Sequence, residues 1–386
     1  MRRFALPALA LLATGGCQPA RQAPAAGEPL AGLTEDQLGR FLLGRALFER
    51  LTTPDEGLGP LFNEERCSAC HGEPASGGSG PALVLKATRY HEGRCDLLVS
   101  DGGDNIQQRA TPLLRARGVE QEQIPARATE TAQVTGPPLF GLGLVEAIPE
   151  ASILAREDSL DGDGDGISGR APRTAAGRVA RFGRKGDAVT VLDFVETALR
   201  FELGLTTAVH PTEETINGQP VPASADPAAE PEIDQRGMGL LADYVRLLAP
   251  PARAAISGAA RDSVRRGEQL FESVGCAACH VRQLRSGPSE VRALHRRPAR
   301  LYSDLLLHDL GPGLAGVCGS AAGPSEFRTA PLWGLRFRTA YLYDGRAATL
   351  NEAITLHGGE AAAARDRYAR LPGQHQALLL RFLASL

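Results

Sequence analysis

Residues 67–71 read Cys-Ser-Ala-Cys-His, and residues 276–280 read Cys-Ala-Ala-Cys-His. In this CxxCH pattern the two thiols are spaced to reach one edge of a haem macrocycle, and the adjacent histidine meets the iron from one face. A single CxxCH could equally be a redox pair or a zinc pair, but two copies in one chain favour haem attachment. The sequence therefore predicts two covalently bound haems c, with His71 and His280 as iron ligands.

A similar segment precedes each motif. Helical spacing of apolar residues predicts one helix over residues 34–50, capped by Thr34, and another over residues 263–273. Each half of the chain also closes with an amphipathic helix, over residues 239–248 and 374–386. The two leading segments share three residue types at the same spacing: Gly44, Leu47 and Phe48 in the first, and Gly267, Leu270 and Phe271 in the second.

This internal repeat predicts a mainly α fold with two cytochrome c-like haem domains, over residues 33–250 and 261–386. The first domain is much longer, and its excess lies between Thr88 and Pro231. Strand signals there are few and short, so we expect a loop-rich insertion. Within it, the Pro/Ala-rich residues 218–231 predict an exposed loop.

The N-terminus has the composition of an export signal. A charged start is followed by an apolar stretch over residues 4–13, too short to cross a bilayer as a stable helix. Small residues then lead to Cys17, which predicts a lipoprotein signal over residues 1–17 with a lipid on that thiol. A simple secretory signal is the alternative. Residues 18–32 are rich in Ala, Pro, Gly and Gln and predict a tether. We expect a periplasmic protein, with a lipid anchor to the membrane if Cys17 is modified.

Composition and cysteine use narrow the functional classes further. The formal net charge is −3, whereas binding to nucleic acid needs a basic footprint, so nucleic acid is excluded as a partner. Lipid and haem account for five of the seven cysteines. Cys95 and Cys318 are left over, either as a disulfide, which an oxidising compartment permits, or as two free buried thiols.

Residues 161–170 read Asp-Gly-Asp-Gly-Asp-Gly-Ile-Ser-Gly-Arg. Carboxylates at alternate positions with glycine at the sixth are typical of the first half of a calcium loop. The twelfth position is Pro172 and not the glutamate of a complete EF-hand. An Asp/Gly-rich turn without metal is the alternative. The predicted calcium ligands are Asp161, Asp163, Asp165 and Ile167.

The sixth ligand of each iron decides what a haem does. An iron with two strong protein ligands transfers electrons, whereas one with an open or labile sixth position binds peroxide. Met238 is the one methionine beyond the signal, and core packing is its simpler role. The remaining candidates are His91, His210, His295, His308, His357 and His375.

Several segments resemble a known family when taken with the two CxxCH motifs. They are residues 135–149, 161–170, 301–310, 327–335, 343–346 and 353–360. The chain is similar to the dihaem oxidoreductases described as peroxidases. That family resembles bacterial dihaem cytochrome c peroxidases and MauG, which oxidises a protein substrate. The resemblance implies reduction of hydrogen peroxide at the first haem, with electrons relayed by the second from a small periplasmic cytochrome or copper protein.

The resemblance also implies roles for particular residues. Peroxidases of this kind place a distal glutamate over the first haem, and Glu146 is the matching candidate for a catalytic acid and base. Its alternative role is structural, bound to backbone amides or an arginine. His357 matches the sixth ligand of the second haem, which is methionine in the peroxidases and tyrosine in MauG. Histidine there implies a lower potential. His91 lies where the peroxidases have a displaceable ligand of the first haem.

Other interpretations stay open. With His91 and His357 as ligands, both irons would be bis-His and the protein would only transfer electrons. MauG-like oxidation of another protein or of a metal ion is a third function.

The basic run over residues 282–300 could dock an acidic electron donor, or be a solvated loop. His308 is a ligand, a propionate partner or a core residue, and Trp333 either carries electrons between the haems or packs against one.

Overall fold

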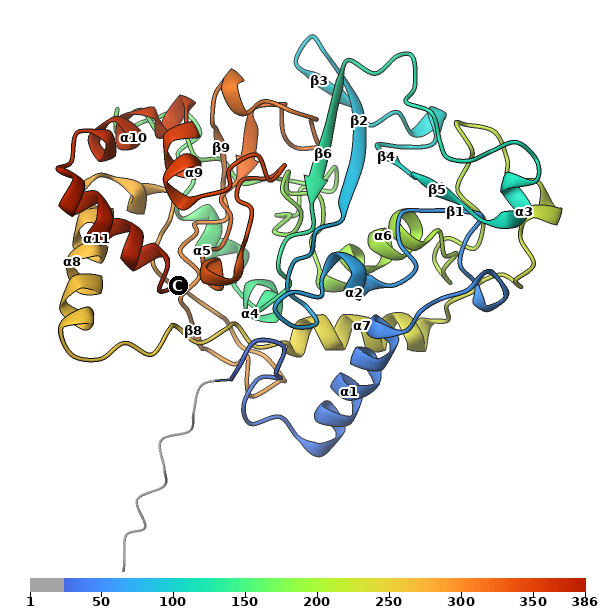
Figure 1. Ribbon diagram of the computed structural model, residues 1–386, viewed down its shortest axis with the longest axis horizontal. Coiled ribbons are helices and arrows are strands. Elements are labelled where there is room, and N and C mark those ends of the chain that lie inside the picture. Colours follow the sequence, from blue (N-terminus) through green and yellow to red (C-terminus); the bar gives the residue numbers. More distant parts are fainter. Residues whose placement is uncertain (1–23) are drawn as a thin grey trace, which may run out of the picture.

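The structure is a computed structural model that describes residues 24–386. The predicted signal and Cys17 lie outside these residues. In Figure 1 most of the first half of the chain lies to the right, and most of the second half, coloured orange to red, lies to the left. None of the helices in the described part of the chain is both long enough and apolar enough to cross a membrane.

A pair of crossing helices anchors each half. In the first half, α1 (Glu35–Glu49) packs on α7 (Gln235–Leu247), and in the second half α8 (Ala259–Ser273) packs on α11 (Gly373–Leu383). The four helices confirm the predicted segments. Thr34 caps α1 as expected, by accepting a hydrogen bond from the Gln37 backbone N–H while the Gln37 side chain accepts one from the Thr34 N–H.

Glycine makes both helix crossings close. A Cβ atom on Gly44 would overlap the carbonyl oxygen of Leu240, and one on Gly267 would overlap the carbonyl oxygen of Leu378. The aromatic rings of Tyr244 and Phe382 follow one turn later on the partner helices. The glycines recognised in the sequence as a repeat therefore mark two equivalent contacts between backbones.

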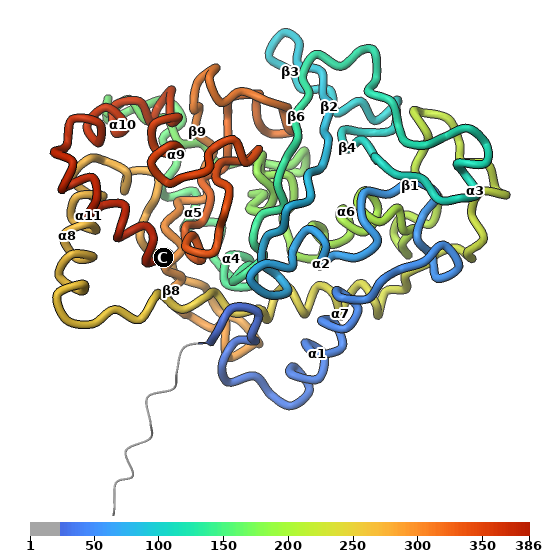
Figure 2. Tube along the Cα trace, in the orientation of Figure 1, coloured from blue at the N-terminus to red at the C-terminus, as the bar shows by residue number. Residues whose placement is uncertain are grey.

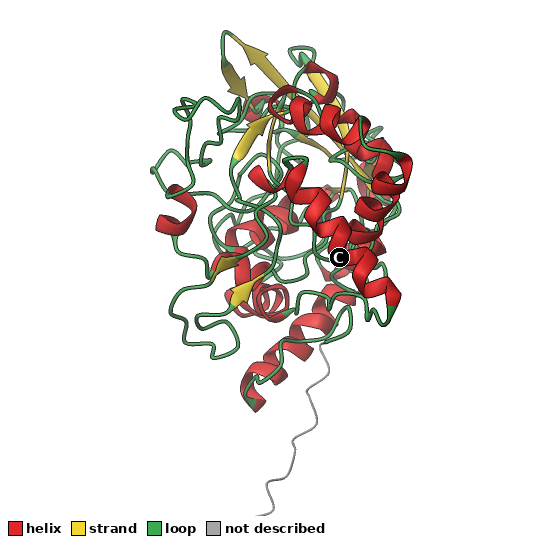
Figure 3. Ribbon diagram, turned by 90° about the vertical axis from the view of Figure 1, so that its left-hand side faces the viewer, coloured by secondary structure: helices red, strands yellow, loops and turns green. Residues whose placement is uncertain are grey.

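The described residues contain seven further α-helices, all shorter except α6. They are α2 (Cys67–Cys70), α3 (Pro112–Arg115), α4 (Leu142–Glu146), α5 (Glu150–Leu154), α6 (Val191–Leu203), α9 (Leu350–Leu356) and α10 (Ala362–Ala369). Long loops join them, as Figures 2 and 3 show.

The insertion of the first half carries more β-structure than the sequence indicated. Strand β2 (Leu83–His91) pairs antiparallel with β6 (Glu130–Thr135), β3 (Arg94–Asp96) and β4 (Asn105–Ile106). Burial along β2 does not alternate strictly, so the period-two signal of a half-buried strand is weak in its sequence. The remaining strands are paired and very short: β1 (Leu61–Phe62) with β5 (Arg109–Ala110), β7 (Leu284–Arg285) with β8 (Pro298–Ala299), and β9 (Leu307–Asp309) with β10 (Glu326–Arg328).

A second internal repeat was not noticed in the sequence. Gly141 and Gly334 both have φ 74° and ψ 8° and each begins a helical turn. The N–H of Gly141 donates to the Leu248 carbonyl, and the N–H of Gly334 donates to the carbonyl of Leu386. Each glycine follows an aromatic residue, Phe140 or Trp333. The two halves thus share a loop as well as a helix pair.

The two halves pack directly on each other. The largest apolar core extends from α1 and α7 into residues of the second half, including Leu301 and Trp333. Part of the predicted tether also belongs to the packed body, because Pro29 bridges to Leu248 and the Leu30 N–H donates to the Leu247 carbonyl. The tether prediction was therefore too long at its C-terminal end. Within the predicted exposed loop of residues 218–231, Ala225 is buried.

Cys95 and Cys318 form a disulfide, which resolves the alternative left open by the sequence. Their Cα atoms are 5.8 Å apart, within the normal range. The bond ties β3 of the first half to a loop of the second half, across 223 residues of sequence.

Removing this disulfide should destabilise the folded protein. We expect the Cys95→Ser, Cys318→Ser double variant to lose about 2–4 kcal/mol of unfolding free energy, because the cross-link restricts a very long loop in the unfolded chain. Urea unfolding followed by circular dichroism measures the change. An unchanged midpoint with both haems attached would contradict this expectation.

Candidate functional site

The two CxxCH histidines lie in matching surroundings. The Nδ1 atom of His71 is 3.1 Å from the carbonyl oxygen of Gly78, and Nδ1 of His280 is 2.9 Å from that of Tyr302. Each ring lies beside a phenylalanine of the leading helix, Phe48 or Phe271, at 6.3 Å between ring centres. A carbonyl at Nδ1 fixes the tautomer and leaves Nε2 as the free ligand atom.

Burial keeps both histidines neutral. It lowers the pKa of His71 and of His280 to about 4. Burial also raises the pKa of the neighbouring thiols of Cys67, Cys70 and Cys276 to about 12. A reactive redox cysteine has a lowered pKa, so these thiols do not resemble a thioredoxin-like pair. None of the four CxxCH thiols takes part in a disulfide.

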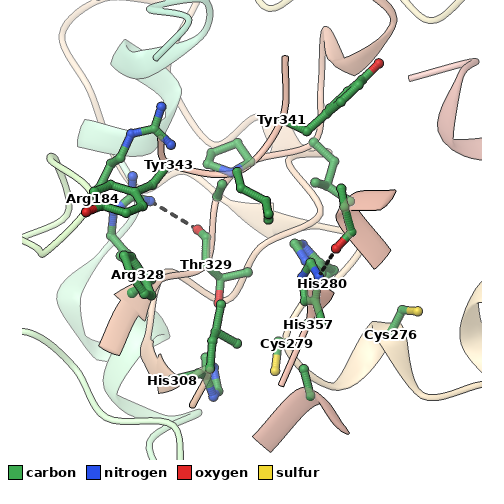
Figure 4. Close-up of a pocket in the computed structure, with 18 of the residues that line it drawn as sticks. Arg184, Cys276, Cys279, His280, His308, Arg328, Thr329, Tyr341, Tyr343 and His357 are labelled. Carbon is green, nitrogen blue, oxygen red and sulfur yellow. Dashed lines mark hydrogen bonds between the residues drawn. The ribbon is translucent and has the colours of Figure 1, made fainter. Parts of the chain in front are cut away.

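A large apolar cavity surrounds the second motif. Its volume is about 300 Å³, and it is lined by Cys276, Cys279, His280 and His357 (Figure 4). It continues to Pro137 of the first half. The neighbouring Gly136 lies against the ring of His71. The cavity therefore extends from one CxxCH motif towards the other.

His357 follows α9, whose N-cap is Thr349. Its Nδ1 atom is 2.7 Å from the Ala353 carbonyl oxygen, and burial lowers its pKa. Nε2 is thus left as a neutral ligand atom in the cavity that His280 lines. Both rings appear together in Figure 4, and they lie close enough for a charge on His357 to lower the pKa of His280. The structure brings this predicted pair of ligands together.

Three half-buried arginines line the same cavity: Arg184, Arg328 and Arg338. Their guanidinium groups donate to backbone carbonyls and to the Thr135 hydroxyl rather than to carboxylates. Burial, together with the mutual repulsion of the three charges, lowers the pKa of Arg184 to about 9. Burial likewise lowers the pKa of Arg328 to about 10. Three positive charges that are partly removed from water in one cavity favour an anionic ligand there.

A haem fits these residues. The two carboxylates of a haem would offset the arginine charges, its apolar ring would fill the cavity, and the cysteines and histidines stand at the attachment spacing. A family model described as "Di-haem oxidoreductase, putative peroxidase" matches residues 126–386.

The chain belongs to the di-haem oxidoreductase family. Its members carry two haems, and the match covers the second CxxCH motif, His357 and the three cavity arginines. No curated protein matches the sequence significantly.

Three solved structures resemble this dihaem oxidoreductase at low identity. Hydrazine synthase from Kuenenia stuttgartiensis is 15% identical, with TM-score 0.44 and coverage of 98% of this chain and 100% of that one. A MauG-like protein associated with microbial copper homeostasis is 16% identical, with TM-score 0.40 and coverages of 96% and 94%. The dihaem peroxidase BthA from Burkholderia thailandensis is 15% identical, with TM-score 0.43 and coverages of 90% and 86%.

Glu146, the predicted acid and base, is held in a structural arrangement. One of its oxygens accepts a hydrogen bond from the Val191 N–H at 2.8 Å, and the other accepts one from Nε of Arg246 at 2.5 Å. It is not among the residues that line the cavity of His280. These contacts match its structural alternative, and the catalytic role stays a prediction that the geometry does not support.

His91 is not brought to His71. It ends β2 at a hairpin turn, its side chain is 67% exposed, and it lies beside Glu92. The structure therefore corrects the prediction that His91 is a ligand of the first haem, because the hairpin directs this residue to solvent. Met238 is buried in the core, as its simpler role required.

His308 is a buried structural cation and not a ligand. Its two ring nitrogens lie 2.9 Å from Asp304 and 2.7 Å from Glu360. Burial alone would lower its pKa, but hydrogen bonds to Asp304, to the Cys279 sulfur and to Glu360 outweigh burial and raise it to about 12. Glu360 also accepts hydrogen bonds from the N–H and hydroxyl of Ser168, at the end of the calcium-like loop.

The calcium-like loop brings together part of the predicted ligand set. Carboxylate oxygens of Asp161 and Asp163 lie within 4.8 Å of each other and of Asp158, which the sequence did not suggest. The Gly166 N–H donates to Asp161. Asp165 instead accepts a hydrogen bond from the Ile167 N–H. Calcium at this loop stays a prediction.

The basic run is exposed, with β7 and β8 forming its hairpin. Its six arginines are all exposed: Arg282, Arg285, Arg292, Arg296, Arg297 and Arg300. The first of these arginines lies two residues after His280.

Trp333 is buried where the halves meet, against Gly141, and it lines the cavity.

A buried polar cluster near the first motif was missed by sequence reasoning. Glu202 of α6 accepts hydrogen bonds from Asn63 at 2.9 Å and from Asn105 at 2.8 Å, and Lys86 pairs with Asp104 at 2.7 Å. The negative charge of Glu202 contributes to the raised pKa of Cys67 and Cys70. These residues come from separate elements and lie far apart in the chain, so they form no motif that could be recognised in the sequence.

Proposed function

We propose that this dihaem oxidoreductase is an exported c-type enzyme that reduces hydrogen peroxide at the first haem, with electrons entering at the second from a small periplasmic donor. The observation that carries the proposal is the cavity beside the second motif. It holds both His280 and His357, a pair suited to electron transfer, it reaches Pro137 of the first half, and three arginines without carboxylate partners line it.

Different residues would hold different parts of the two haems. The thiols of each CxxCH would add across the two vinyl groups of one haem and form thioether bonds, while Nε2 of His71 or His280 binds the iron. His357 would be the sixth ligand of the second haem. Arg184, Arg328 and Arg338 would pair with propionates. When bound, the haems supply single-electron redox chemistry that the side chains lack.

The overall reaction is H₂O₂ + 2 e⁻ + 2 H⁺ → 2 H₂O. The donor supplies the two electrons one at a time, and two redox centres in one chain can hold both before the O–O bond breaks. Exposed arginines beside His280 support an acidic donor that docks there. The Cys95–Cys318 disulfide supports the periplasm as the location, with a lipid on Cys17 as the proposed anchor.

The alternatives are a bis-His electron-transfer cytochrome and a MauG-like oxidase of a partner. Low-temperature EPR of the diferric and half-reduced protein, with calcium present, separates the first alternative from an enzyme. We expect a high-spin ferric signal from one haem and turnover of peroxide with a reduced donor. Low-spin signals alone in both states, without turnover, would establish electron transfer instead.

We also propose that calcium binds the loop at Asp158, Asp161 and Asp163, which Ser168 and Glu360 connect to His308. The Asp161→Asn, Asp163→Asn variant should bind calcium more than about tenfold more weakly, since two of three clustered charges are lost. Isothermal titration measures this, and Asp262→Asn, exposed on α8, is the control. Equal affinity in both variants would remove this loop from calcium binding.

A further inference from the structure

The loops that lead into α6 and α9 are copies of each other. Phe182 bridges to Ala188 in the first half, and Tyr341 bridges to Ala347 in the second. Within these turns Gly186 has φ 71° and Gly345 has φ 75°. Both bridges therefore span the same number of residues and place a left-handed glycine at the same position.

Both helices also start alike. Thr190 caps α6 and Thr349 caps α9. In each case the threonine side chain accepts from the third backbone N–H of the helix, and an acidic residue there accepts from the threonine N–H. Four residues after each threonine, Phe194 and Ala353 line the same cavity. The helices are therefore equivalent in register as well as in position along the chain.

This register identifies the residue that corresponds to His357. His357 stands eight residues after Thr349, and the residue eight after Thr190 is Ala198. Ala198 is partly exposed within α6, on the face that carries Phe194 one turn earlier. An alanine has no atom that can bind iron. Where the second haem has a histidine, the first half offers a methyl group.

The histidines nearest in sequence do not replace the missing ligand. His210, after α6, has its Nδ1 2.6 Å from Glu196, and its side chain is 45% exposed. His91 is exposed at its hairpin. The two halves therefore differ at this position: the second half has a side chain that can bind an iron, and the first half has none.

Helix α6 continues past Ala198, whereas α9 ends at Leu356, one residue before His357. The extra turn places Glu202 on the same face as Phe194 and Ala198, at spacings of four residues. Its oxygens are held by the neutral amides of Asn63 and Asn105, and burial raises its pKa. Its charge lies close enough to the first CxxCH motif to act on both thiols.

We propose that the α6 face at Ala198 is the open sixth side of the first haem, and that Glu202 carries protons for the peroxide that binds there. The inference rests on the proposed peroxide reduction for its substrate. It assigns the acid and base to Glu202 and not to Glu146, whose carboxylate a guanidinium occupies.

The proton steps balance within the reaction already given. The carboxylate of Glu202 would accept a proton from one oxygen of the peroxide and return it to the other, which leaves as water when the O–O bond breaks. The two electrons that the donor supplies, with two protons from solvent, account for the second water. General acid–base catalysis of this kind contributes about 10²–10⁴-fold to a rate.

Cyanide binding counts the open sixth positions without any turnover. We expect the oxidised wild-type protein to bind one cyanide per chain, His357→Ala to bind two, and Ala198→His to bind none with high affinity. In EPR, Ala198→His should convert the high-spin signal to a low-spin one. Thr197→His, exposed on the neighbouring face of α6, is the matched control and should behave as wild type.

Two outcomes would overturn the coordination part of the inference. One is cyanide affinity and spin state that are unchanged in Ala198→His with both haems attached. The other is equal loss of cyanide binding in Thr197→His. If Ala198→His does not fold, Ala198→Met tests the same position with an unbranched, more flexible ligand, and an unchanged high-spin EPR signal in that variant without cyanide would equally overturn it.

Glu202→Gln tests the proton role separately. We expect wild-type spin state and cyanide affinity with peroxide turnover reduced about 100-fold, because only proton transfer is lost. Glu272→Gln, exposed on α8, is the control. Unchanged peroxide turnover in Glu202→Gln would mean that Glu202 does not transfer the protons. A turnover loss of about the same size in Glu146→Gln alone would contradict the assignment to Glu202 as well. If wild type binds one cyanide that Ala198→His abolishes, yet never reduces peroxide, the proposed function fails while the open position stands.

Discussion

Replacing both cysteines of one CxxCH motif with alanine is expected to remove one covalently bound haem from the protein, and only one. The two motifs are far apart in sequence and each has its own histidine, phenylalanine and helix pair. Cys67→Ala with Cys70→Ala should therefore leave the second haem attached, and Cys276→Ala with Cys279→Ala should leave the first. Either variant should lose peroxide turnover, because each half supplies one redox centre.

Mass spectrometry of the denatured protein measures the attached haem directly. Wild type should carry two haems, each double variant one, and the combined variant none. The Cys95→Ser, Cys318→Ser variant is the matched control and should retain both, because its sulfurs bind each other. Two haems retained through denaturation in either CxxCH variant would refute covalent attachment at these motifs.

Removing the His357 side chain is expected to have the second largest effect. Its Nε2 is the free ligand atom in the cavity that His280 lines, so His357→Ala should turn the second haem from low spin to high spin. His357→Met should stay low spin and raise the potential of that haem by on the order of 0.1 V, within the roughly 0.8 V range that axial ligands span.

EPR and potentiometric titration of the same samples measure both changes. His375→Ala is the control, because His375 is exposed on α11 and should leave spectrum and potential unchanged. A second haem that stays low spin in His357→Ala would mean that another residue is its ligand, and the predicted lowering of the potential by histidine would fail with it.

The part of the site that sequence could predict depends on local spacing. The CxxCH motifs, the helices with their repeated glycines and the Thr34 cap are all read from neighbouring residues, and the structure shows each helix. That these glycines are points of close helix contact became known only from the structure. His357 was found by resemblance, and it faces the same cavity as His280. Each of these features is decided within a few turns of chain.

Features that depend on distant residues were not predicted. His91 and Glu146 were plausible by position in the chain, yet a hairpin exposes the first and Arg246, 100 residues away, binds the second. The arginines of the cavity and the Glu202 cluster belong to no sequence motif. Their partners arrive from separate elements, so only the folded chain shows whether a charge is paired, exposed or left in a cavity.

The amino-acid sequence by itself determined that the chain carries two equivalent CxxCH motifs, each between a pair of helices in the order of the chain, because thiol spacing and helical periodicity are properties of short segments. Only the tertiary structure decided how the two halves differ. The equivalence of Ala198 and His357 becomes visible when two copied turns fix the register of α6 and α9. Whether a residue can reach the iron depends on the packing of whole elements, since side-chain contacts across a fold are set by long-range burial and not by neighbours in sequence.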